Sequence, residues 1–200
     1  PDYIQALNAA LESTGAWQGE MIFQHKNGDH FTAWVSTNIL KEENGQGRSY
    51  ITVFSDITHA KIAQDTIQRQ ATLDPLTGLA NRNLTMDRLH QMLANCRRNM
   101  SMFAVLFMDL DHFKLINDSL GHAAGDELLY KTAQRIKEVL READSVGRMG
   151  GDEFIVLLGN LNSIEDAIPI TENILDAVRQ PLHIAGHLIH AAASIGVTIY

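Results

Sequence analysis

The chain has 200 residues, 45% of them hydrophobic, so it is long enough to bury one or two globular cores. Its 16 Lys and Arg residues are outnumbered by 24 Asp and Glu residues, and the formal net charge of −8 excludes nucleic-acid binding through a general basic surface. The single cysteine, Cys96, excludes an internal disulfide and favours a reducing, cytoplasmic location. No apolar run approaches the roughly 18 residues that a membrane span needs, so any membrane anchor would belong to a longer parent protein.

The first third of the chain has the pattern of a small antiparallel sheet. Two predicted strands, Gly19–His25 and His30–Leu40, flank Lys26-Asn27-Gly28-Asp29, in which Asn-Gly is a strong hairpin signal. A second polar turn, Glu42–Gly47, leads into a third predicted strand, Tyr50–Phe54.

A helix is predicted next, beginning at Asp56-Ile57-Thr58. Its apolar face is narrow and rich in alanine, and consists of Ile57, Ala60, Ala63, Ile67 and Ala71. Such a stripe makes a weak helix in isolation, so we expect it to need a partner. The partner is either its own domain or the same helix of a second chain, in a short parallel coiled coil.

From Asp74 onward, helices and strands alternate. Cys96 falls on the apolar stripe of the first helix, with Met86, Leu89, Leu93 and Met100, and is interpreted as a core residue. The order of elements predicts an α+β fold, with a mostly antiparallel sheet and helices packed against it. The predicted elements are helices Arg82–Asn99, His112–Leu120, Ala124–Glu142 and Ser163–Val178, and strands Met102–Asp109, Ser145–Met149, Glu153–Leu158, Leu182–Ile184 and Ala193–Tyr200.

The most informative motif is a glycine-rich turn followed by two acids. Gly150-Gly151 lets the backbone bend sharply and lets a large anion approach without meeting a Cβ atom. Asp152 and Glu153 beside that opening point to a divalent cation, which would join the carboxylates to a phosphate. Taken alone, this motif is more often a hairpin with solvated acids, so its interpretation depends on the rest of the chain.

A second acidic position follows the apolar strand Met102–Asp109. Asp109 is predicted at the end of this strand, just before a helix whose first N–H groups are free to bind a phosphate. Asp111 is expected to cap that helix. A cation held by Asp109 would therefore lie where a phosphate can also be bound.

Two further polar pairs have both a structural and a functional interpretation. Asn117 and Asp126 offer an amide and a carboxylate that can read the edge of guanine, or they are a helix C-cap and a helix N-terminal charge. Arg141 and Asp144 would share a helix face if the predicted helix persisted that far, as a surface ion pair or as a phosphate and guanine contact.

Two stretches of the chain resemble known families. Gly15–Glu20, Lys26–Asp29 and Asp56–Lys61 resemble the C-terminal half of a PAS sensor domain, which implies a PAS-derived segment at 1–59 and a signalling linker helix at 60–73. The second resemblance, to the diguanylate cyclase or GGDEF family, covers 74–200. It is carried by four motifs in order, Asp74–Arg82, Asp109–Asp118, Gly121–Asp126 and Arg148–Phe154.

The GGDEF resemblance implies a palm-like, ferredoxin-like nucleotidyl cyclase fold and an enzyme that condenses two GTP into cyclic di-GMP. Each subunit of a homodimer would hold one GTP, and two pyrophosphates would be released. Mg²⁺, or Mn²⁺, would be held by Asp109, the Leu110 carbonyl and an acid of the turn, Asp152 or Glu153. The acid that is not a metal ligand would be the base, and we favour Asp152 over Glu153.

The same resemblance implies a set of substrate and regulatory residues. Arg141 and Asp144 match an inhibitory site that binds the product, so regulation by the PAS segment and by cyclic di-GMP is expected. The expected substrate-binding residues are Leu76, His112, Phe113, Lys114, Asn117, His122, Asp126, Gly150 and Gly151. Family members continue with a further helix bearing basic residues that reach the triphosphate, so we expect such a helix beyond Tyr200.

Two other functions remain open. One is a catalytically silent GTP-binding module that regulates an adjoining domain, such as an EAL phosphodiesterase. The other is an interaction domain that uses a ferredoxin-like sheet for RNA, which the acidic charge and the lack of an aromatic RNA-binding signature disfavour.

Overall fold

The computed structural model describes residues 2–41, 48–99 and 101–200. The predicted turn Glu42–Gly47 and Met100, the last residue of the predicted helical stripe, lie outside the described residues. The chain divides into two compact units, Pro1–Ile67 and Gln68–Tyr200, and each has its own antiparallel sheet.

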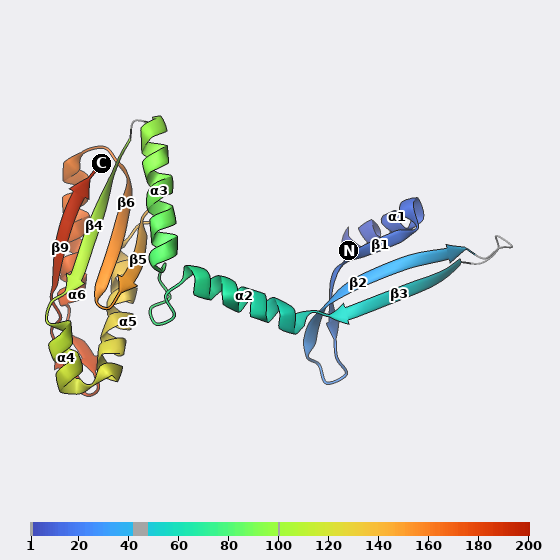
Figure 1. The fold of residues 1–200 in the computed structure, drawn as a ribbon, viewed down its shortest axis with the longest axis horizontal. Helices are drawn as coiled ribbons and strands as arrows, with labels where there is room; N and C mark the ends of the chain where they lie inside the picture. The colour runs from blue at the N-terminus through green and yellow to red at the C-terminus, as the bar shows by residue number, and fades with distance from the viewer. Residues whose placement is uncertain (1, 42–47, 100) are drawn as a thin grey trace. The chain divides into compact units, whose positions relative to one another are not determined.

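The N-terminal unit is a three-stranded sheet with a helix against it (Figure 1). Helix α1 (Asp2–Thr14) is followed by β1 (Ala16–Gln24), β2 (His30–Lys41) and β3 (Arg48–Asp56), in the spatial order β1-β2-β3. All three predicted strands are present, each somewhat longer than expected. The β1–β2 hairpin turns at Gly28, whose φ of 95° is strained for other residues and explains the Asn-Gly signal.

Helix α2 (Thr58–Thr72) confirms the helix predicted after the sheet. Its N-terminus is capped by Asp56, whose Oδ1 accepts the Thr58 N–H at 2.9 Å. Ile62 and Ile67 are largely exposed, at 58% and 66% of their surface. The helix therefore presents bulky apolar side chains to solvent.

The sheet of the C-terminal unit has four strands in the order β5-β6-β4-β9, all antiparallel. They are β4 (Met102–Leu110), β5 (Ser145–Gly150), β6 (Glu153–Leu161) and β9 (Ala193–Ile199). The central pair β4–β6 carries long apolar runs, and five consecutive residues of β6 are buried. The predicted α+β architecture with a mostly antiparallel sheet is confirmed. The small hairpin of β7 (Leu182–Ile184) and β8 (His187–Ile189) was only half predicted, since β8 was missed.

The helices of this unit differ from the predictions mainly at their ends. Helix α5 (His122–Val139) ends three residues before the predicted Glu142, because Leu140 has an extended backbone. The region predicted as one helix from Ser163 is a short 3-10 turn (Ile164–Asp166) followed by α6 (Ala167–Arg179), so that Pro169 falls in the first turn, where no N–H is needed. The α-helices are α3 (Arg82–Asn99), α4 (Phe113–Leu120), α5 (His122–Val139) and α6 (Ala167–Arg179).

The main core lies between the sheet and helices α5 and α6 (Figure 1). Alternate residues of β4 point into it and are fully buried with α5 side chains such as Leu128 and Ile136. Helix α3 contacts β4, β5 and β6, and its Cys96 is buried, as predicted. Along β4, Phe107 and Asp109 alternate with the core residues, and both are exposed. The acidic end of β4 thus lies on the opposite face from the main core.

Within the described ranges, none of the helices combines the length and the apolar character that crossing a membrane would require.

Candidate active site

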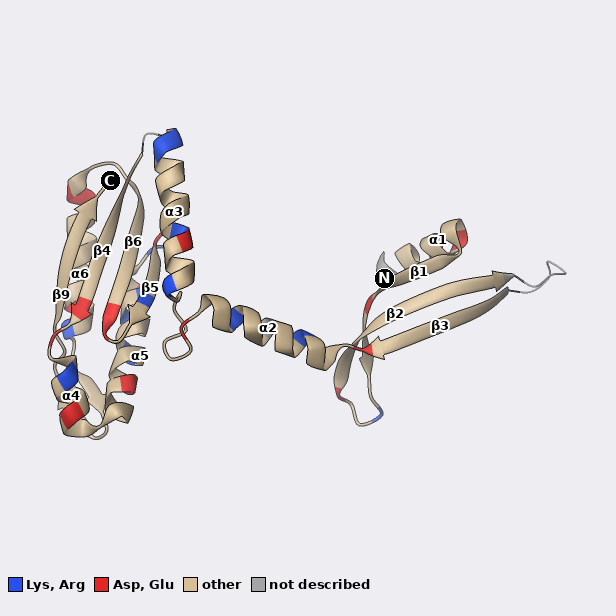
Figure 2. Cartoon of the chain, viewed as in Figure 1, with Lys and Arg blue, Asp and Glu red and all other residues tan. Residues whose placement is uncertain are grey.

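The strand register brings two acids of distant motifs together. Asp109, at the end of β4, is the direct cross-strand partner of Glu153, the first residue of β6. Directly opposed residues of an antiparallel pair have Cβ atoms about 4.5–5.5 Å apart, so the two carboxylates are neighbours on one face of the sheet. Figure 2 shows the acidic ends of β4 and β6 lying side by side.

The hairpin between β5 and β6 turns on two glycines with positive φ, 138° at Gly150 and 55° at Gly151. Other residues would be strained in both conformations. A Cβ atom built at either glycine meets nothing within 4 Å. The turn is therefore open to its surroundings, and Asp152 follows directly at its tip.

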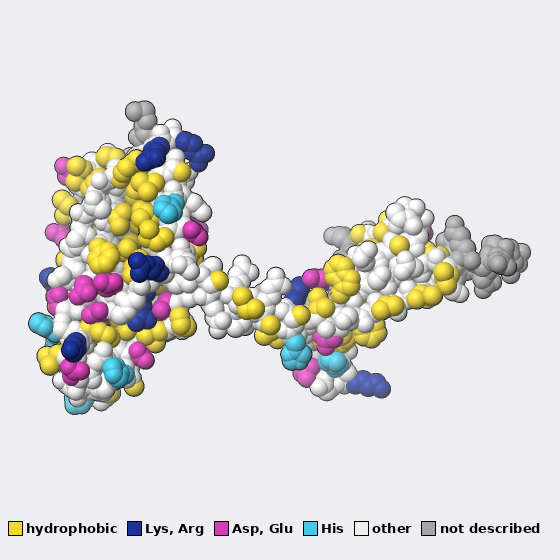
Figure 3. Space-filling view, in the orientation of Figure 1, with side chains coloured by type: hydrophobic (Ala, Val, Ile, Leu, Met, Phe, Trp, Pro, Cys, Tyr) yellow, Lys and Arg dark blue, Asp and Glu magenta, His cyan; other side chains and the backbone are white. Residues whose placement is uncertain are grey.

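The acids of this region repel one another. Although Asp109 is exposed, partial desolvation at the strand end raises its pKa, and the nearby charges of Asp152, Glu153 and Asp111 raise it further. Figure 3 shows acidic side chains gathered below a band of hydrophobic ones on this face. A divalent cation would relieve the repulsion, so the chemistry of the donor set fits one.

The carboxylates alone do not form a complete metal cage. Among the described residues, no group of three or more His, Cys, Asp or Glu side chains is arranged to hold a metal ion. Leu110 can add only its backbone carbonyl, because its side chain is buried in the core. One or two carboxylates, completed by substrate phosphates, is the arrangement by which proteins commonly bind Mg²⁺.

Asp111 does not cap helix α4, contrary to the prediction. Its Oδ1 accepts a hydrogen bond of 2.8 Å from the Ser194 hydroxyl on β9, and its N–H donates to the Ala192 carbonyl. The residue before α4 is His112, in the left-handed conformation with φ 60°, and it makes no side-chain cap. Because β9 holds Asp111, the first N–H groups of α4 receive no carboxylate cap from it. Phe113 and Lys114 form the first turn there, with Phe113 half-buried and Lys114 exposed.

Asn117 and Asp126 belong to two helices that pack closely. A Cβ atom added to Gly125 on α5 would lie 1.9 Å from Oδ1 of Asn117 and 3.2 Å from the Phe113 ring. Only a glycine lets the Asn117 amide pack against α5 beside Asp126, which is exposed. The interpretation of Asp126 as a solvated helix charge and its interpretation as a guanine contact are both consistent with that exposure. His122, the first residue of α5, is also exposed.

Leu76 lies in the segment between α2 and α3, which we term the Asp74 loop (residues 73–81). It lines a cavity of about 360 Å³ together with Tyr130 and Gln134 of α5. Tyr130 stands four residues after Asp126, so the two lie on the same face of α5, one turn apart. Leu76 therefore shares a cavity with a residue that lies one turn along α5 from Asp126.

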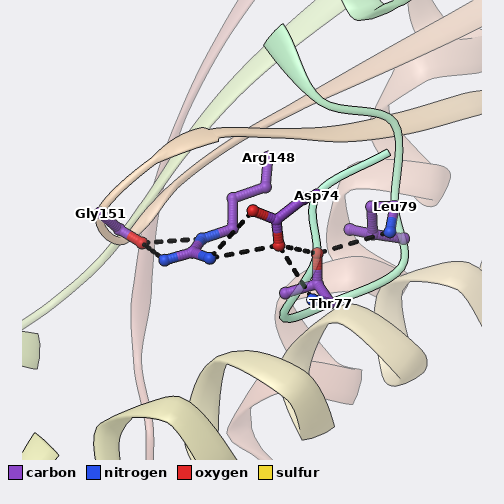
Figure 4. A network of polar contacts seen from close by, with 5 residues as sticks. All are labelled: Asp74, Thr77, Leu79, Arg148 and Gly151. Atoms are coloured by element: carbon purple, nitrogen blue, oxygen red, sulfur yellow. Dashed lines mark hydrogen bonds and ion pairs between the residues drawn. The ribbon is translucent and has the colours of Figure 1, made fainter. Parts of the chain in front are cut away.

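Figure 4 shows a polar network that joins the Asp74 loop to the glycine turn. Nη1 of Arg148 lies 3.2 Å from each carboxylate oxygen of Asp74, and its Nε and Nη2 donate to the Gly151 carbonyl at 2.9 and 2.7 Å. Thr77 donates its N–H and its hydroxyl to Asp74 at 2.9 and 2.6 Å. No role was assigned to Asp74 or Arg148 from the sequence. Each is the first residue of one of the four family motifs, and that shared position was the signal that could have identified them.

Arg141 and Asp144 do not share a helix face, because α5 has ended before them. Instead, Oδ2 of Asp144 accepts the backbone N–H of Arg141 at 3.1 Å, and Oδ1 accepts the Gly159 N–H at 3.3 Å. Both residues line a cavity of about 340 Å³ with an apolar floor that includes Leu79 and Val146. Further cations at this cavity are Arg88 and Lys137.

The family model for the diguanylate cyclase GGDEF domain matches residues 71–200. Among curated proteins, the chain is 43% identical over 136 residues to the diguanylate cyclase TpbB of Pseudomonas aeruginosa, covering 68% of this chain and 31% of TpbB. It is 41% identical over 138 residues to the cyclic di-GMP phosphodiesterase NbdA of the same organism, covering 69% of this chain and 18% of NbdA. The chain thus spans less than a third of the length of these relatives.

Solved structures are similar over the same region. The isolated GGDEF domain of TpbB is 44% identical, with a TM-score of 0.62, covering 64% of this chain and 75% of that one. A structure of the coiled coil and GGDEF domain of DgcB from Caulobacter crescentus, in complex with c-di-GMP, is 25% identical with a TM-score of 0.65, covering 72% of this chain and 77% of that one.

Proposed function

Because the chain belongs to the family of GGDEF diguanylate cyclase domains, we propose that its C-terminal unit condenses two GTP into cyclic di-GMP with release of two pyrophosphates. The observation that carries the proposal is the pairing of Asp109 with Glu153 beside the open Gly150-Gly151 turn. Two carboxylates and an unobstructed backbone meet there, which suits a nucleoside triphosphate that brings its own cation.

Asp109, the Leu110 carbonyl and an acid of the turn would hold Mg²⁺ or Mn²⁺. When bound, the cation neutralises charge on the phosphates and on the departing pyrophosphate. Asp152 or Glu153, whichever is not a metal ligand, would accept the proton of the attacking 3′-hydroxyl. We favour Asp152 as this base, since Glu153 is the direct cross-strand partner of Asp109.

Asn117 and Asp126 are proposed to read guanine, by an amide and a carboxylate that match its edge. Gly125 supports the proposal, because it lets the Asn117 side chain pack tightly at this position. Leu76 would contact the base from the Asp74 loop. The phosphates would lie near the uncapped start of α4, where the backbone N–H groups of His112, Phe113 and Lys114 and the side chains of His112 and Lys114 would offer hydrogen bonds or positive charge. His122, at the start of α5, is proposed as a further phosphate contact.

The reaction requires two copies of the chain, because the attacking 3′-hydroxyl belongs to the GTP of a second subunit. We propose that the exposed apolar side chains of α2 pair with their copies and that the PAS-like N-terminal unit controls how often two catalytic units meet. The exposure of Ile67, which lies on the predicted apolar stripe, supports this pairing. Activity would then rise faster than linearly with protein concentration.

Arg141 and Asp144 are proposed to bind the product as an inhibitor. Asp144 is held by two backbone N–H groups, and Arg141 is exposed beside a cavity of about 340 Å³. An exposed guanidinium can grip a phosphate bidentately. The DgcB complex is bound to c-di-GMP, so a solved relative binds this nucleotide.

A second candidate is a GTP-binding module that regulates an adjoining phosphodiesterase domain without turnover. The similarity to NbdA, which is a phosphodiesterase, favours it, since that protein carries a similar segment within a much longer chain. The acids and glycines of the turn are intact here, which favours the cyclase.

The deciding experiment is Mg²⁺-dependent pyrophosphate release from GTP over a range of protein concentrations. Release that rises faster than linearly with concentration supports the dimeric cyclase. GTP binding without release supports the regulatory module, and the absence of GTP binding contradicts both proposals. Replacing Arg141 by Ala is expected to relieve inhibition by added cyclic di-GMP, and unchanged inhibition would contradict the assignment of the product site.

A further inference from the structure

The guanidinium of Arg148 is engaged on two sides by the protein itself. One side faces the carboxylate of Asp74, and the other donates two hydrogen bonds to the carbonyl of Gly151 (Figure 4). The side chains of Arg148 and Asp74 are only 13% and 16% exposed. An arginine used in this way has few donors left for a phosphate, so its contribution to the site has to pass through Gly151.

The carbonyl of Gly151 belongs to the same planar peptide unit as the N–H of Asp152. In a trans peptide, these two groups point in opposite directions, and none of the described peptide bonds is cis. Two bonds from Arg148 therefore set the plane of this peptide and direct the Asp152 N–H away from the guanidinium. Gly150 and Gly151 have no side chains to restrict the turn, so such an external restraint has a large effect on its conformation.

The restraint is anchored by the Asp74 loop, which is itself docked on β5. The N–H of Arg148 donates to the Ala80 carbonyl at 2.9 Å, and Ala80 forms a β-bridge with Gly147. A Cβ atom at Gly147 would lie 1.8 Å from the Thr85 hydroxyl and 2.9 Å from the Ala80 carbonyl, so glycine is needed for this close approach. Thr77 in turn fixes the Asp74 carboxylate.

We propose that Arg148 is a positioning residue for the reaction. It holds the Gly151–Asp152 peptide so that the turn carboxylates face Asp109 before substrate arrives, and Asp74 orients Arg148 for this task. The inference rests on the proposed cyclase function and adds Asp74 and Arg148 to the residues that build its cation site. Such preorganisation acts on the transition state more than on GTP binding.

The test compares Arg148→Ala, Arg148→Lys and Asp74→Asn in the full chain, at a temperature where circular dichroism shows each to be folded. At saturating Mg²⁺, we expect kcat to fall by about 100-fold in Arg148→Ala with KM for GTP nearly unchanged, because a misplaced catalytic group lowers kcat and kcat/KM together. The matched control is Arg179→Ala, which breaks an exposed pair with Asp176 at 3.9 Å and should leave kcat unchanged.

A second readout does not depend on turnover. Electron paramagnetic resonance with Mn²⁺ and guanosine 5′-[α,β-methylene]triphosphate, which cannot release pyrophosphate, measures how well the turn carboxylates are arranged. We expect about tenfold weaker Mn²⁺ binding in Arg148→Ala and in Asp74→Asn, but not in Arg179→Ala. If Asp74→Asn instead leaves Mn²⁺ binding intact while strengthening binding of the analogue, Arg148 binds phosphate directly and the proposal is wrong.

The outcomes separate the inference from the proposed function. Wild-type kcat and Mn²⁺ affinity in a folded Arg148→Ala overturn the positioning role, and Arg148→Lys decides in the same way if the alanine variant does not fold. A wild-type chain that releases no pyrophosphate contradicts the cyclase, whereas the Mn²⁺ comparison still decides what Arg148 does.

Discussion

In the C-terminal unit, Asp74 and the acids around Asp109 have opposite electrostatic surroundings. Asp74 lies in a loop where an arginine and a threonine satisfy its carboxylate. Asp109 lies at a strand end, where its nearest charged neighbours are the acids Asp152, Glu153 and Asp111. The charge of Asp74 is neutralised within the protein, whereas the acids around Asp109 are left with an excess of negative charge.

The difference shows in the direction of the two pKa shifts. Burial tends to raise the pKa of Asp74, but hydrogen bonds from Thr77 and Arg148 outweigh burial and lower it below the usual 3.8. At Asp109, burial and the neighbouring acids act together, and the pKa is raised. A satisfied carboxylate stabilises the fold, whereas a group of unsatisfied ones is set up to bind a cation.

The largest expected effect on activity comes from removing the charge of Asp109. Asp109→Asn should lower cyclase activity by about 1,000-fold, since it deletes a cation ligand that stabilises charge in the transition state. Pyrophosphate release at saturating GTP and Mg²⁺ measures this. Asp176→Asn, at an exposed position on α6, is the control and should be fully active. An Asp109→Asn variant within tenfold of wild type would remove Asp109 from the proposed site.

The next effect tests whether the base-reading pair depends on close helix packing. Gly125→Ala would place a Cβ atom 1.9 Å from Oδ1 of Asn117 and should displace that amide. We expect GTP affinity to fall by about 10- to 100-fold, as for the loss of one or two hydrogen bonds to the base. Calorimetric titration with the α,β-methylene analogue measures it. Gly196→Ala, where the nearest atom is 4.0 Å away, is the control. Unchanged affinity in Gly125→Ala would contradict the role of Asn117.

A smaller effect, on the free energy of unfolding, is expected at Asp74. Asp74→Asn should lower the free energy of unfolding at neutral pH by about 2 kcal/mol, because it weakens charge-assisted hydrogen bonds to a mostly buried group. The folded-state pKa of Asp74 is depressed, so its contribution is present above the unfolded pKa and is lost as the pH falls through the depressed value. The stabilities of the two proteins from urea titrations should therefore approach each other as the pH falls below 3.8, and converge below the depressed folded-state pKa. A constant difference down to the lowest pH would contradict the origin of the effect.

The smallest expected effect is a gain in thermal stability on replacing Asp109. The raised pKa of Asp109 means that its ionised form disfavours folding at neutral pH. This cost begins to shrink as the pH falls through the raised value and is gone below the unfolded pKa. Without a divalent cation, Asp109→Asn should raise Tm by roughly 1–2 °C, a small gain because the side chain is exposed. Differential scanning calorimetry in a chelating buffer measures this, and a lowered Tm would show that Asp109 is structurally satisfied.

The local features of the fold could be predicted from the sequence. The apolar run of β4 and the periodic stripe of α3 are strong signals in themselves, and both elements lie where expected. The acids and glycines of the turn are consecutive in the chain, so their neighbourhood needed no tertiary information. Short elements such as β8 were missed because three residues, two of them exposed, leave little pattern.

Features that depend on pairing between distant segments were harder to predict. Asp111 was expected to cap α4 because it precedes that helix, but a hydroxyl on β9, 83 residues later, binds it instead. The Arg148–Asp74 pair spans 74 residues and forms only because Gly147 lets the Asp74 loop lie against β5. Arg141 and Asp144 have helical spacing, but the helix ends before them, so their arrangement depends on backbone contacts that spacing does not reveal.

The docking of the Asp74 loop also affects how this sheet can grow. β5 is an outer strand of the sheet, and such a strand normally exposes backbone groups that can recruit another chain. Here the bridge from Ala80 to Gly147 and the bond from the Arg148 N–H to Ala80 occupy that border with the protein's own backbone. A strand that added beside β5 would therefore have to displace these contacts, so this border is protected from edge-to-edge aggregation by the same segment that orients Arg148.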